Sequence, residues 1–315
     1  MCESVGMTQT AAEGRGRFVL GYGACALAAC IWGTGFYFGK IALREMGVEH
    51  LLLYRFLFAC VVLAPLVWRH PARLSAAEWR VLLLASFLGV PLQFLVQYYG
   101  LLLTTVTHAS LMVGTLPMLL AVAAMLFAHE HLDAWGWLAL AGSTVGVVLI
   151  VLGRTPATAE GHGPSIAGDL LVVLSLVIAL GWIMLNKRLM DHHPPVVVTA
   201  YGVLSGSAML AVMVLATRGR PPLHGVSGQA WLALAASGLL CTASTTLLWN
   251  WGIHRVPASR AGVFLNLEPA VGSLLGVQLL GDRLGPFAWA GGGLIIAAAV
   301  ALTTRGHTEA TAILE

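Results

Sequence analysis

The sequence predicts an all-α integral membrane protein whose ten transmembrane helices form two inverted repeats of five helices. Of the 315 residues, 58% are hydrophobic and only 10% are charged, whereas a soluble domain carries about 25% charged residues. The mean hydropathy is +0.84. Ten apolar stretches are each about as long as the roughly 20 residues that a membrane-crossing helix needs. The second half of the chain also resembles the first half, which is the third observation behind this fold class.

The predicted spans follow one another through short connections, none long enough for a soluble domain. The longest connection, 153–165, is rich in Pro, Gly and Thr, which is typical of a linker. We therefore divide the chain into a first repeat, 1–157, with a short N-terminal tail, and a second repeat, 158–315, with a short C-terminal tail. The spans are expected at 18–39, 48–68, 79–103, 106–128, 133–152, 166–187, 195–217, 228–251, 258–280 and 285–304.

The repeat is visible when the two halves are laid over each other. A shift of 147 residues pairs Lys40 with Lys187 and Tyr54 with Tyr201. Five spans in each half place the second copy upside down relative to the first, and inverted repeats are the usual architecture of secondary transporters. A shift of 152 residues pairs Gly100 with Gly252, Thr107 with Ser259, Ala109 with Ala261, Pro117 with Pro269, Glu130 with Asp282 and Trp137 with Trp289.

The orientation follows from the Lys and Arg residues of the connections, because cytoplasmic loops carry an excess of them. With the N-terminus inside, ten of these residues fall on the cytoplasmic side and six outside. We therefore expect a multi-pass protein of the plasma (inner) membrane with both termini in the cytoplasm.

Several local features are similar to those of a known family. They are Tyr54-Arg55-Phe56 in the second span, Pro117 and Glu268-Pro269 in the fourth and ninth spans, and the acids Glu130 and Asp282 that close these spans. With ten spans in two inverted repeats, the chain resembles the drug/metabolite transporter superfamily, of the EamA type, over nearly its whole length. Asp282 departs from the glutamate that is more frequent in the family, and Gly202 stands opposite Arg55 in the second repeat.

The resemblance implies a secondary transporter that exports small metabolites, often amino acids, without ATP. It also implies that spans 1–4 and 6–9 line a central cavity while spans 5 and 10 stand aside. Spans 5 and 10 contain almost no polar side chains, which agrees independently. The polar and aromatic residues of the other spans are similar to those of the exporters of amino acids, including aromatic ones.

Polar side chains follow one face of the eighth span. Thr242, Thr246, Asn250 and His254 are four residues apart and therefore share one helix face. The third span places amides and aromatic rings at the same depth. Such surfaces would make an apolar cavity with a few hydrogen-bonding groups, although Thr and Asn side chains can also simply join neighbouring helices.

Charged residues inside spans are costly and usually functional. Arg55 is expected to face a cavity, to pair with Glu268, or to extend back to the membrane surface. Glu268 is expected to be the only acid well inside a span and is a candidate proton carrier. His108 and His254 lie near span ends, where a structural hydrogen bond and a proton-carrying role are both open. Trp32 and Trp182 lie mid-span and could gate a pathway or pack.

The predicted function is export of small metabolites, chiefly amino acids with apolar or aromatic side chains, by alternating access. A multidrug exporter of lipophilic cations and a non-transporting membrane scaffold are the alternatives. The candidate substrate-binding residues are Trp32, Tyr54, Arg55, Gln93, Gln97, Tyr98, Tyr99, Trp182, Thr246, Trp249 and Asn250, and the coupling or gating candidates are His108, His254 and Glu268.

Other functional classes lack sequence support. No GxxxxGK[ST] motif for ATP is present, and neither HExxH nor GxSxG indicates an enzyme. The five Cys residues have no metal-ligand spacing, and a net charge of +3 is too weak to suggest nucleic acid. We expect no cofactor and no catalytic or metal site, and we expect the partners to be a small-molecule substrate and the lipid bilayer, with possible proton coupling.

Overall fold

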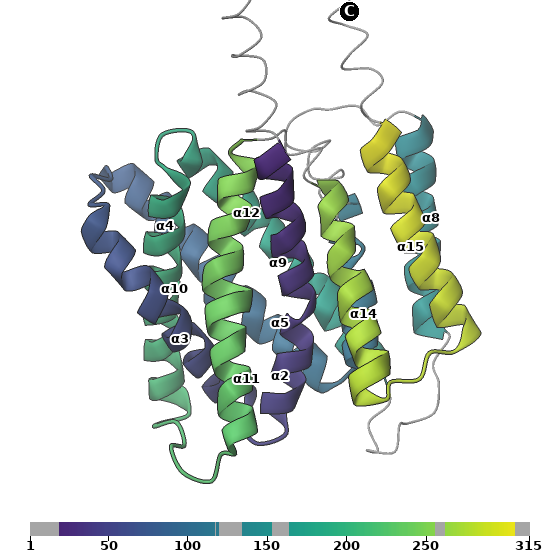
Figure 1. Cartoon of the computed structure of the whole chain (residues 1–315), viewed down its shortest axis with the longest axis horizontal. Coiled ribbons are helices and arrows are strands. Elements are labelled where there is room, and N and C mark those ends of the chain that lie inside the picture. Colours follow the sequence, from purple (N-terminus) through teal and green to yellow (C-terminus); the bar gives the residue numbers. More distant parts are fainter. Residues whose placement is uncertain (1–18, 117, 120–133, 153–163, 256–261, 306–315) are drawn as a thin grey trace, which may run out of the picture.

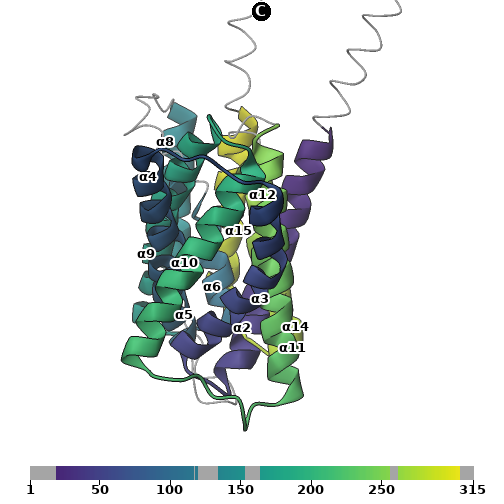
Figure 2. The same cartoon turned by 90° about the vertical axis from the view of Figure 1, so that its left-hand side faces the viewer.

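The computed structural model describes residues 19–116, 118–119, 134–152, 164–255 and 262–305, and all regular secondary structure within these ranges is helical. The helices stand side by side in one bundle (Figures 1 and 2). They are a helix over residues 19–33, α2 (Gly35–Leu43), α3 (Val48–Arg69), α4 (Ala76–Phe87), η1 (Leu88–Leu92), α5 (Gln93–Leu102), α6 (Val106–Val113), α8 (Ala134–Leu152), α9 (Ile166–Met190), α10 (Pro195–Thr217), α11 (Gly228–Gly238), η2 (Leu239–Ser244), α12 (Thr245–Ile253), η3 (Gly262–Asn266), α14 (Leu267–Leu280) and α15 (Pro286–Arg305).

Six of the described helical stretches are long and apolar enough to cross a membrane. Three further apolar helices are shorter, and the predicted fourth span, 106–128, is described only in part. The prediction of an all-helical membrane protein is therefore confirmed for the described residues, whereas the number ten stays a prediction. The six long stretches are Val19–Leu43, Val48–Arg69, Ala76–Leu102, Ile166–Met190, Pro195–Thr217 and Gly228–Ile253.

Two of the long stretches contain a π-helical turn at matching places. Residues 88–92 of η1 fall on 240–244 under the 152-residue shift, and η2 covers Leu239–Ser244. In η1, Pro91 has no N–H to donate to the helical ladder. In η2, the hydroxyls of Thr242 and Ser244 donate to the carbonyls five residues earlier. Single π-turns inside α-helices frequently mark functional sites.

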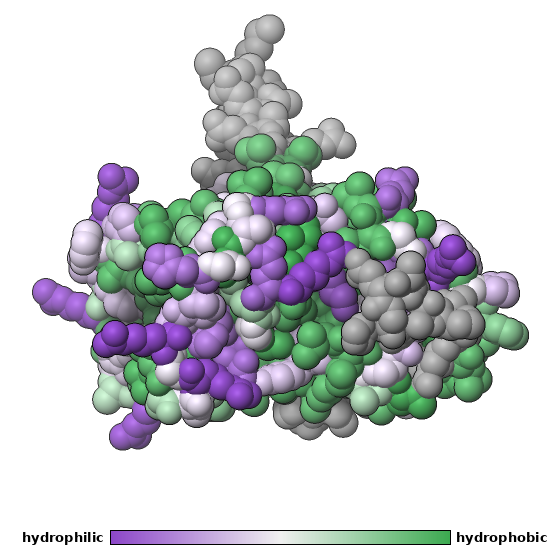
Figure 3. Space-filling view, turned by 90° about the horizontal axis from the view of Figure 1, so that it is seen from below, coloured by the Kyte–Doolittle hydropathy of each residue, from purple (hydrophilic) through white to green (hydrophobic). Residues whose placement is uncertain are grey.

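The bundle has two ends, which we name after helices of the second half. At the α11 end (lower in Figure 1), α2 and α10 end and α11 begins. At the α12 end, α9 and α12 end and α10 begins. Figure 3 looks onto the α11 end, where hydrophilic and apolar side chains are mixed.

Glycine allows close helix crossings at paired positions of the two halves. A Cβ on Gly100 would lie 2.9 Å from the carbonyl oxygen of Gly168, where α5 crosses α9. A Cβ on Gly252 would lie 2.5 Å from Cys25 Sγ, where α12 crosses the helix over 19–33. Gly100 and Gly252 are one of the pairs of the 152-residue overlay. Both crossings therefore need a residue without a side chain, which lets the backbones approach.

The two last helices of the halves stand apart from the others. α8 packs mainly against α15, and the pair lies at one side of the bundle (Figure 1). Gly146 and Gly291 meet at this contact, because a Cβ on Gly146 would lie 2.7 Å from the carbonyl oxygen of Gly291. Neither helix contributes a residue to the central cavity. This is the arrangement expected for the fifth and tenth spans.

Candidate substrate cavity

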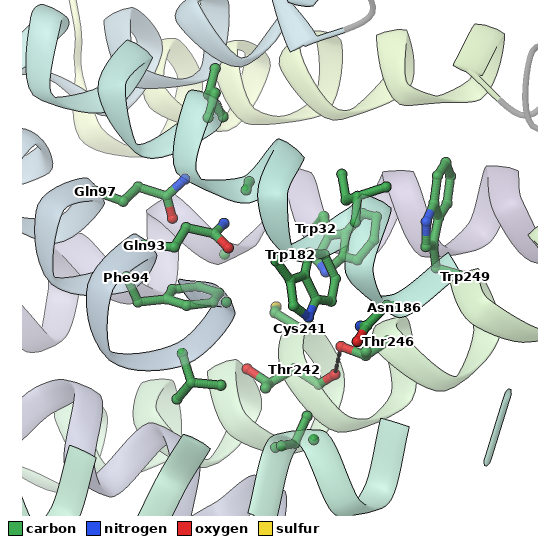
Figure 4. Close-up of a pocket in the computed structure, with 18 of the residues that line it drawn as sticks. Trp32, Gln93, Phe94, Gln97, Trp182, Asn186, Cys241, Thr242, Thr246 and Trp249 are labelled. Atoms are coloured by element: carbon green, nitrogen blue, oxygen red, sulfur yellow. Dashed lines mark hydrogen bonds between the residues drawn. The ribbon is translucent and has the colours of Figure 1, made fainter. Parts of the chain in front are cut away.

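A cavity lies in the middle of the bundle and is walled by residues of both halves of the chain (Figure 4). Its empty volume is ≈ 1110 Å³, part of which opens to solvent. On α9, α10 and α12 the lining residues come within about one turn of the α12 end, at Asn186, Val198 and Trp249. Both π-helical turns contribute to the wall, through Gly89 and Cys241 among others.

Nine of the fourteen candidate residues line this cavity. They come from segments far apart in the sequence, so the fold gathers them in one place. They are Trp32, Arg55, Gln93, Gln97, Tyr98, Trp182, Thr246, Trp249 and Glu268.

Two aromatic candidates point elsewhere because neighbouring helix positions face directions about 100° apart. Tyr54 donates its hydroxyl hydrogen to Pro222 O at 2.8 Å and packs edge-on against Trp231. Tyr99 is 36% exposed and donates to the Glu49 carboxylate. Their neighbours Arg55 and Tyr98 take the inward positions instead. Neither Tyr54 nor Tyr99 therefore lines the cavity.

Three polar candidates also lie outside the cavity wall. The amide of Asn250 is buried and donates to Thr199 Oγ1 at 2.6 Å, and Thr199 is itself a lining residue. His108 is buried against Asp169. His254 directly follows α12 and is exposed at that end of the bundle. Asn250 can thus position a lining hydroxyl, while the two histidines do not reach the cavity.

Arg55 is fixed with its guanidinium group directed inward. Nε donates to Thr242 Oγ1 at 2.8 Å, and Nη1 donates to the Tyr98 hydroxyl. The guanidinium carbon lies 4.6 Å from the centre of the Phe94 ring, a cation–π distance. Only 4% of Arg55 is exposed, so the side chain does not extend to the membrane surface. Nη2 donates to Cys241 O at 3.5 Å, which leaves one N–H of Nη1 and one of Nη2 without a hydrogen-bond partner among the described residues.

Glu268 brings a carboxylate to the cavity from the first turn of α14. The short 3₁₀ segment η3 precedes α14, and a helix N-terminus favours negative charge. A Cβ on Gly33 would lie 2.7 Å from the Glu268 carbonyl oxygen, so glycine lets this turn approach Trp32. Within the described part of the chain, Glu268 forms no hydrogen bond or ion pair, including with Arg55.

Aromatic rings form much of the remaining wall. The centres of the Trp32 and Trp249 rings are 5.4 Å apart at 50°, a favourable tilted contact. Trp182 lies against η1, where a Cβ on Gly89 would come within 2.3 Å of the indole. The amide oxygen of Gln93 is buried without a hydrogen-bond partner among the described residues. The cavity therefore offers broad apolar surfaces, one cation, one anion and a vacant acceptor.

Sequence reasoning missed several polar positions. Asn186 lines the cavity and is only 5% exposed, and the signal for it was a polar residue near the end of the sixth span. Asp169, in the first turn of α9, is only 1% exposed, so the fold buries a second acid near the end of a span. Asp169 was overlooked because it is the fourth residue of its span.

Comparison with known proteins finds a family and several relatives that this chain resembles over most of its length. The sequence profile of the EamA-like transporter family matches residues 19–152 and 166–304. An uncharacterized transporter of Archaeoglobus fulgidus is 27% identical over 282 residues, which are 89% of this chain and 95% of the relative. A probable terminal-alkyne amino-acid exporter of Streptantibioticus cattleyicolor is 25% identical over 292 residues, covering 90% of this chain and 93% of the relative.

A solved crystal structure of a protein has a similar fold. Its TM-score is 0.64 at 19% identity, with 93% of this chain and 99% of that chain covered. The family profile spans most of the helical bundle described above. The chain belongs to the EamA-like transporter family.

Proposed function

We propose that this transporter exports small zwitterions with an apolar or aromatic side chain, most of all amino acids, by alternating access between two inverted five-helix repeats. The observation that carries the proposal is the central cavity, in which Arg55 and the unpaired Glu268 face a mainly apolar space that contains several aromatic rings. An ammonium group fits the Glu268 carboxylate, and a carboxylate fits the free N–H groups of Arg55. The side chain of the substrate then lies against the tryptophan rings.

Neutral groups complete this fit. The vacant amide oxygen of Gln93 can accept from an ammonium, and Asn186 offers a further buried amide. A polyanionic substrate such as a nucleotide sugar would need several cationic groups, whereas Arg55 is the only Lys or Arg lining the described cavity. The relative named as a probable amino-acid exporter supports the same substrate class.

The cavity wall supports the repeat and hence the alternating-access part of the proposal. Lining residues fall on lining residues under the two shifts, and the family profile matches in two stretches on either side of the linker. The pairs are Gly35 with Trp182, Phe36 with Ile183, Arg55 with Gly202, Phe56 with Val203, Gly89 with Cys241, Val90 with Thr242, Phe94 with Thr246, Gln97 with Trp249, Val113 with Leu265 and Leu116 with Glu268.

The helix contacts follow the same pairing. α4 packs on α9 as α11 packs on α2, and α4 packs on α10 as α11 packs on α3. α3 with α10, α6 with α14 and α8 with α15 are contacts of an element with its own counterpart. Such pairing supports a twofold relation between a first repeat, 1–157, and a second repeat, 158–315. From the distribution of Lys and Arg in the connections, we propose that both termini lie in the cytoplasm of a plasma-membrane protein.

The test is transport by the purified chain in proteoliposomes, with competition between substrate classes. Phenylalanine, methionine and threonine are expected to compete for the same site. Glu268→Gln is expected to weaken binding of these ammonium-bearing substrates, whereas Leu116→Gln, at the paired lining position, tests whether any new amide in the wall has that effect. If Glu268→Gln binds these substrates normally, the Glu268 carboxylate is not part of the substrate-binding site.

Export of lipophilic cations is the second candidate function. It is favoured by the unpaired Glu268 and by the tilted pair of Trp32 and Trp249, since cations bind over tryptophan faces. Competition separates the two candidates. Inhibition by hydrophobic cations alone, with none by amino acids, would replace the first proposal with the second.

A further inference from the structure

A second cluster of ionisable side chains lies outside the cavity, near the α11 end of the bundle. Asp169, in the first turn of α9, accepts a hydrogen bond from Thr104 Oγ1 at 2.6 Å. Its other carboxylate oxygen lies 3.3 Å from His108 Nδ1 on α6. The exposed fractions of the His108 and Asp169 side chains are 2% and 1%. The cluster is therefore a buried acid–histidine pair.

The pair is separate from the substrate cavity. Leu176 is the lining residue of α9 nearest in sequence to Asp169, and seven helical residues span about 10 Å. None of the three residues of the cluster lines the cavity. The role proposed above for the cavity does not use them. Burying an ionisable pair in a membrane bundle is costly, and such pairs usually mark a functional site.

The pair also joins the two halves of the chain at a tight crossing. His108 and Thr104 precede the linker, while Asp169 follows it. Beside them, a Cβ on Gly168 would lie 2.8 Å from the carbonyl carbon of Leu103. A change of charge at Asp169 or His108 therefore acts directly on the contact of α9 with α5 and α6, where the halves meet.

Few other charged groups face the pair. From α2, Lys40 Nζ donates to Thr104 O at 2.8 Å and to Leu101 O at 2.9 Å. After α14, Asp282 accepts from the Thr107 backbone N–H at 2.9 Å. The titratable residues of α5 are Tyr98 and Tyr99, whose hydroxyls are bonded to Arg55 and Glu49. Of the ionisable side chains named here, only His108 lies within hydrogen-bond distance of the Asp169 carboxylate.

We propose that Asp169 and His108 form a proton-binding site that couples a proton gradient to transport, an inference that rests on the transport function proposed above. Histidine commonly gains its charge between about pH 5 and pH 8. A proton taken up by the pair leaves an imidazolium beside a carboxylate. Their attraction is strong in a dry interior and holds α9 on α6 at the α11 end. Release of the proton weakens this contact and allows the end to open.

The experiment uses the full chain in proteoliposomes and compares net transport under a proton gradient with substrate exchange at equal pH. The parent protein is expected to be accelerated by the gradient. Asp169→Asn and His108→Gln are expected to lose this acceleration completely while exchange persists. Asp282→Asn is the control, because it removes a carboxylate bonded to α6 at the same end and is expected to keep the acceleration.

Several results would overturn the proposal. One is gradient acceleration that survives in Asp169→Asn, and another is acceleration lost only in Glu268→Gln, which would place coupling in the cavity. A parent protein that transports equally with and without a gradient refutes the coupling site but leaves the transport function standing. A parent protein without any transport refutes the transport function itself.

A milder variant covers the case in which Asp169→Asn does not fold. Thr104→Val keeps both ionisable groups and removes one hydrogen bond to the carboxylate. It is expected to shift the pH midpoint of gradient-free transport without abolishing exchange. An unshifted midpoint in folded Thr104→Val protein counts against the site.

Discussion

Removing the hydroxyl of Tyr98 tests whether a fixed Arg55 is needed for substrate binding. Tyr98→Phe keeps the ring, which is 1% exposed, and deletes the hydroxyl that accepts from Arg55 Nη1 and donates to Gly35 O at 3.5 Å. A hydrogen bond to a charged group contributes about 1.5–3 kcal/mol. The bond from Nε to Thr242 remains, and cavity water can replace part of the lost one, so we expect a loss of ~1.4 kcal/mol in binding. That corresponds to roughly a tenfold weaker affinity.

The assay is the equilibrium dissociation constant of an amino-acid substrate measured on purified protein, together with initial transport rates. Tyr37→Phe is the matched control, because the Tyr37 hydroxyl has no hydrogen bond among the described residues and the ring lies outside the cavity. Gly39→Ala is a second perturbation, since its methyl group would lie 2.7 Å from Tyr98 Cε1 and displace the ring. Equal affinities for Tyr98→Phe and Tyr37→Phe would refute the reasoning.

Three further predictions concern stability and topology. Gly238→Ala should lower the free energy of unfolding in detergent by about 1–3 kcal/mol, because its Cβ would lie 2.3 Å from a backbone oxygen of α3. Gly228→Ala is the control and should be tolerated, because its Cβ would have nothing within 4 Å. Equal melting temperatures for the two variants would contradict the close approach of α11 to α3. The pKa of Glu45 is lowered by hydrogen bonds from the side chain and backbone of the α11 N-cap residue. The ionised Glu45 therefore stabilises the folded protein fully above the unfolded pKa near 4.5, and this contribution is lost as pH falls through the lower folded pKa. Glu45→Gln should remove this part of the acid dependence of stability, and an unchanged loss of stability at low pH would count against the prediction. In a cysteine-free background, an impermeant thiol reagent added outside should label Leu223→Cys and not Arg73→Cys, and the reverse pattern would invert the proposed orientation.

The helix positions could be predicted closely because a bilayer fixes both length and composition. The predicted 48–68 and 195–217 correspond to Val48–Arg69 and Pro195–Thr217. The predicted start at 79 is wrong by three residues. Ser75 and Glu78 form a capping box that begins the helix at Ala76, and a hydropathy average does not detect hydrogen bonds of this kind.

The cavity could be predicted only in part. Mid-span residues such as Arg55 and Trp182 were identified because polar or very large side chains stand out in apolar spans. Tyr54 and Tyr99 were placed in the cavity although their side chains point away from it, since a helix that is apolar all round carries no signal for which face lines a cavity. The contact of Asp169 with His108 depends on segments that only the tertiary structure brings together.

The paired positions of the cavity wall have a consequence for how such a protein could arise. The first half contributes the guanidinium and the second half contributes the carboxylate, while the partners of Arg55 and Glu268 are Gly202 and Leu116. A dimer of two first halves would enclose two cations, and a dimer of two second halves two anions. After a gene duplication, divergence at these few positions would make the fused copies mutually dependent. Co-expressed half-genes are then expected to restore a zwitterion site that neither half can supply alone.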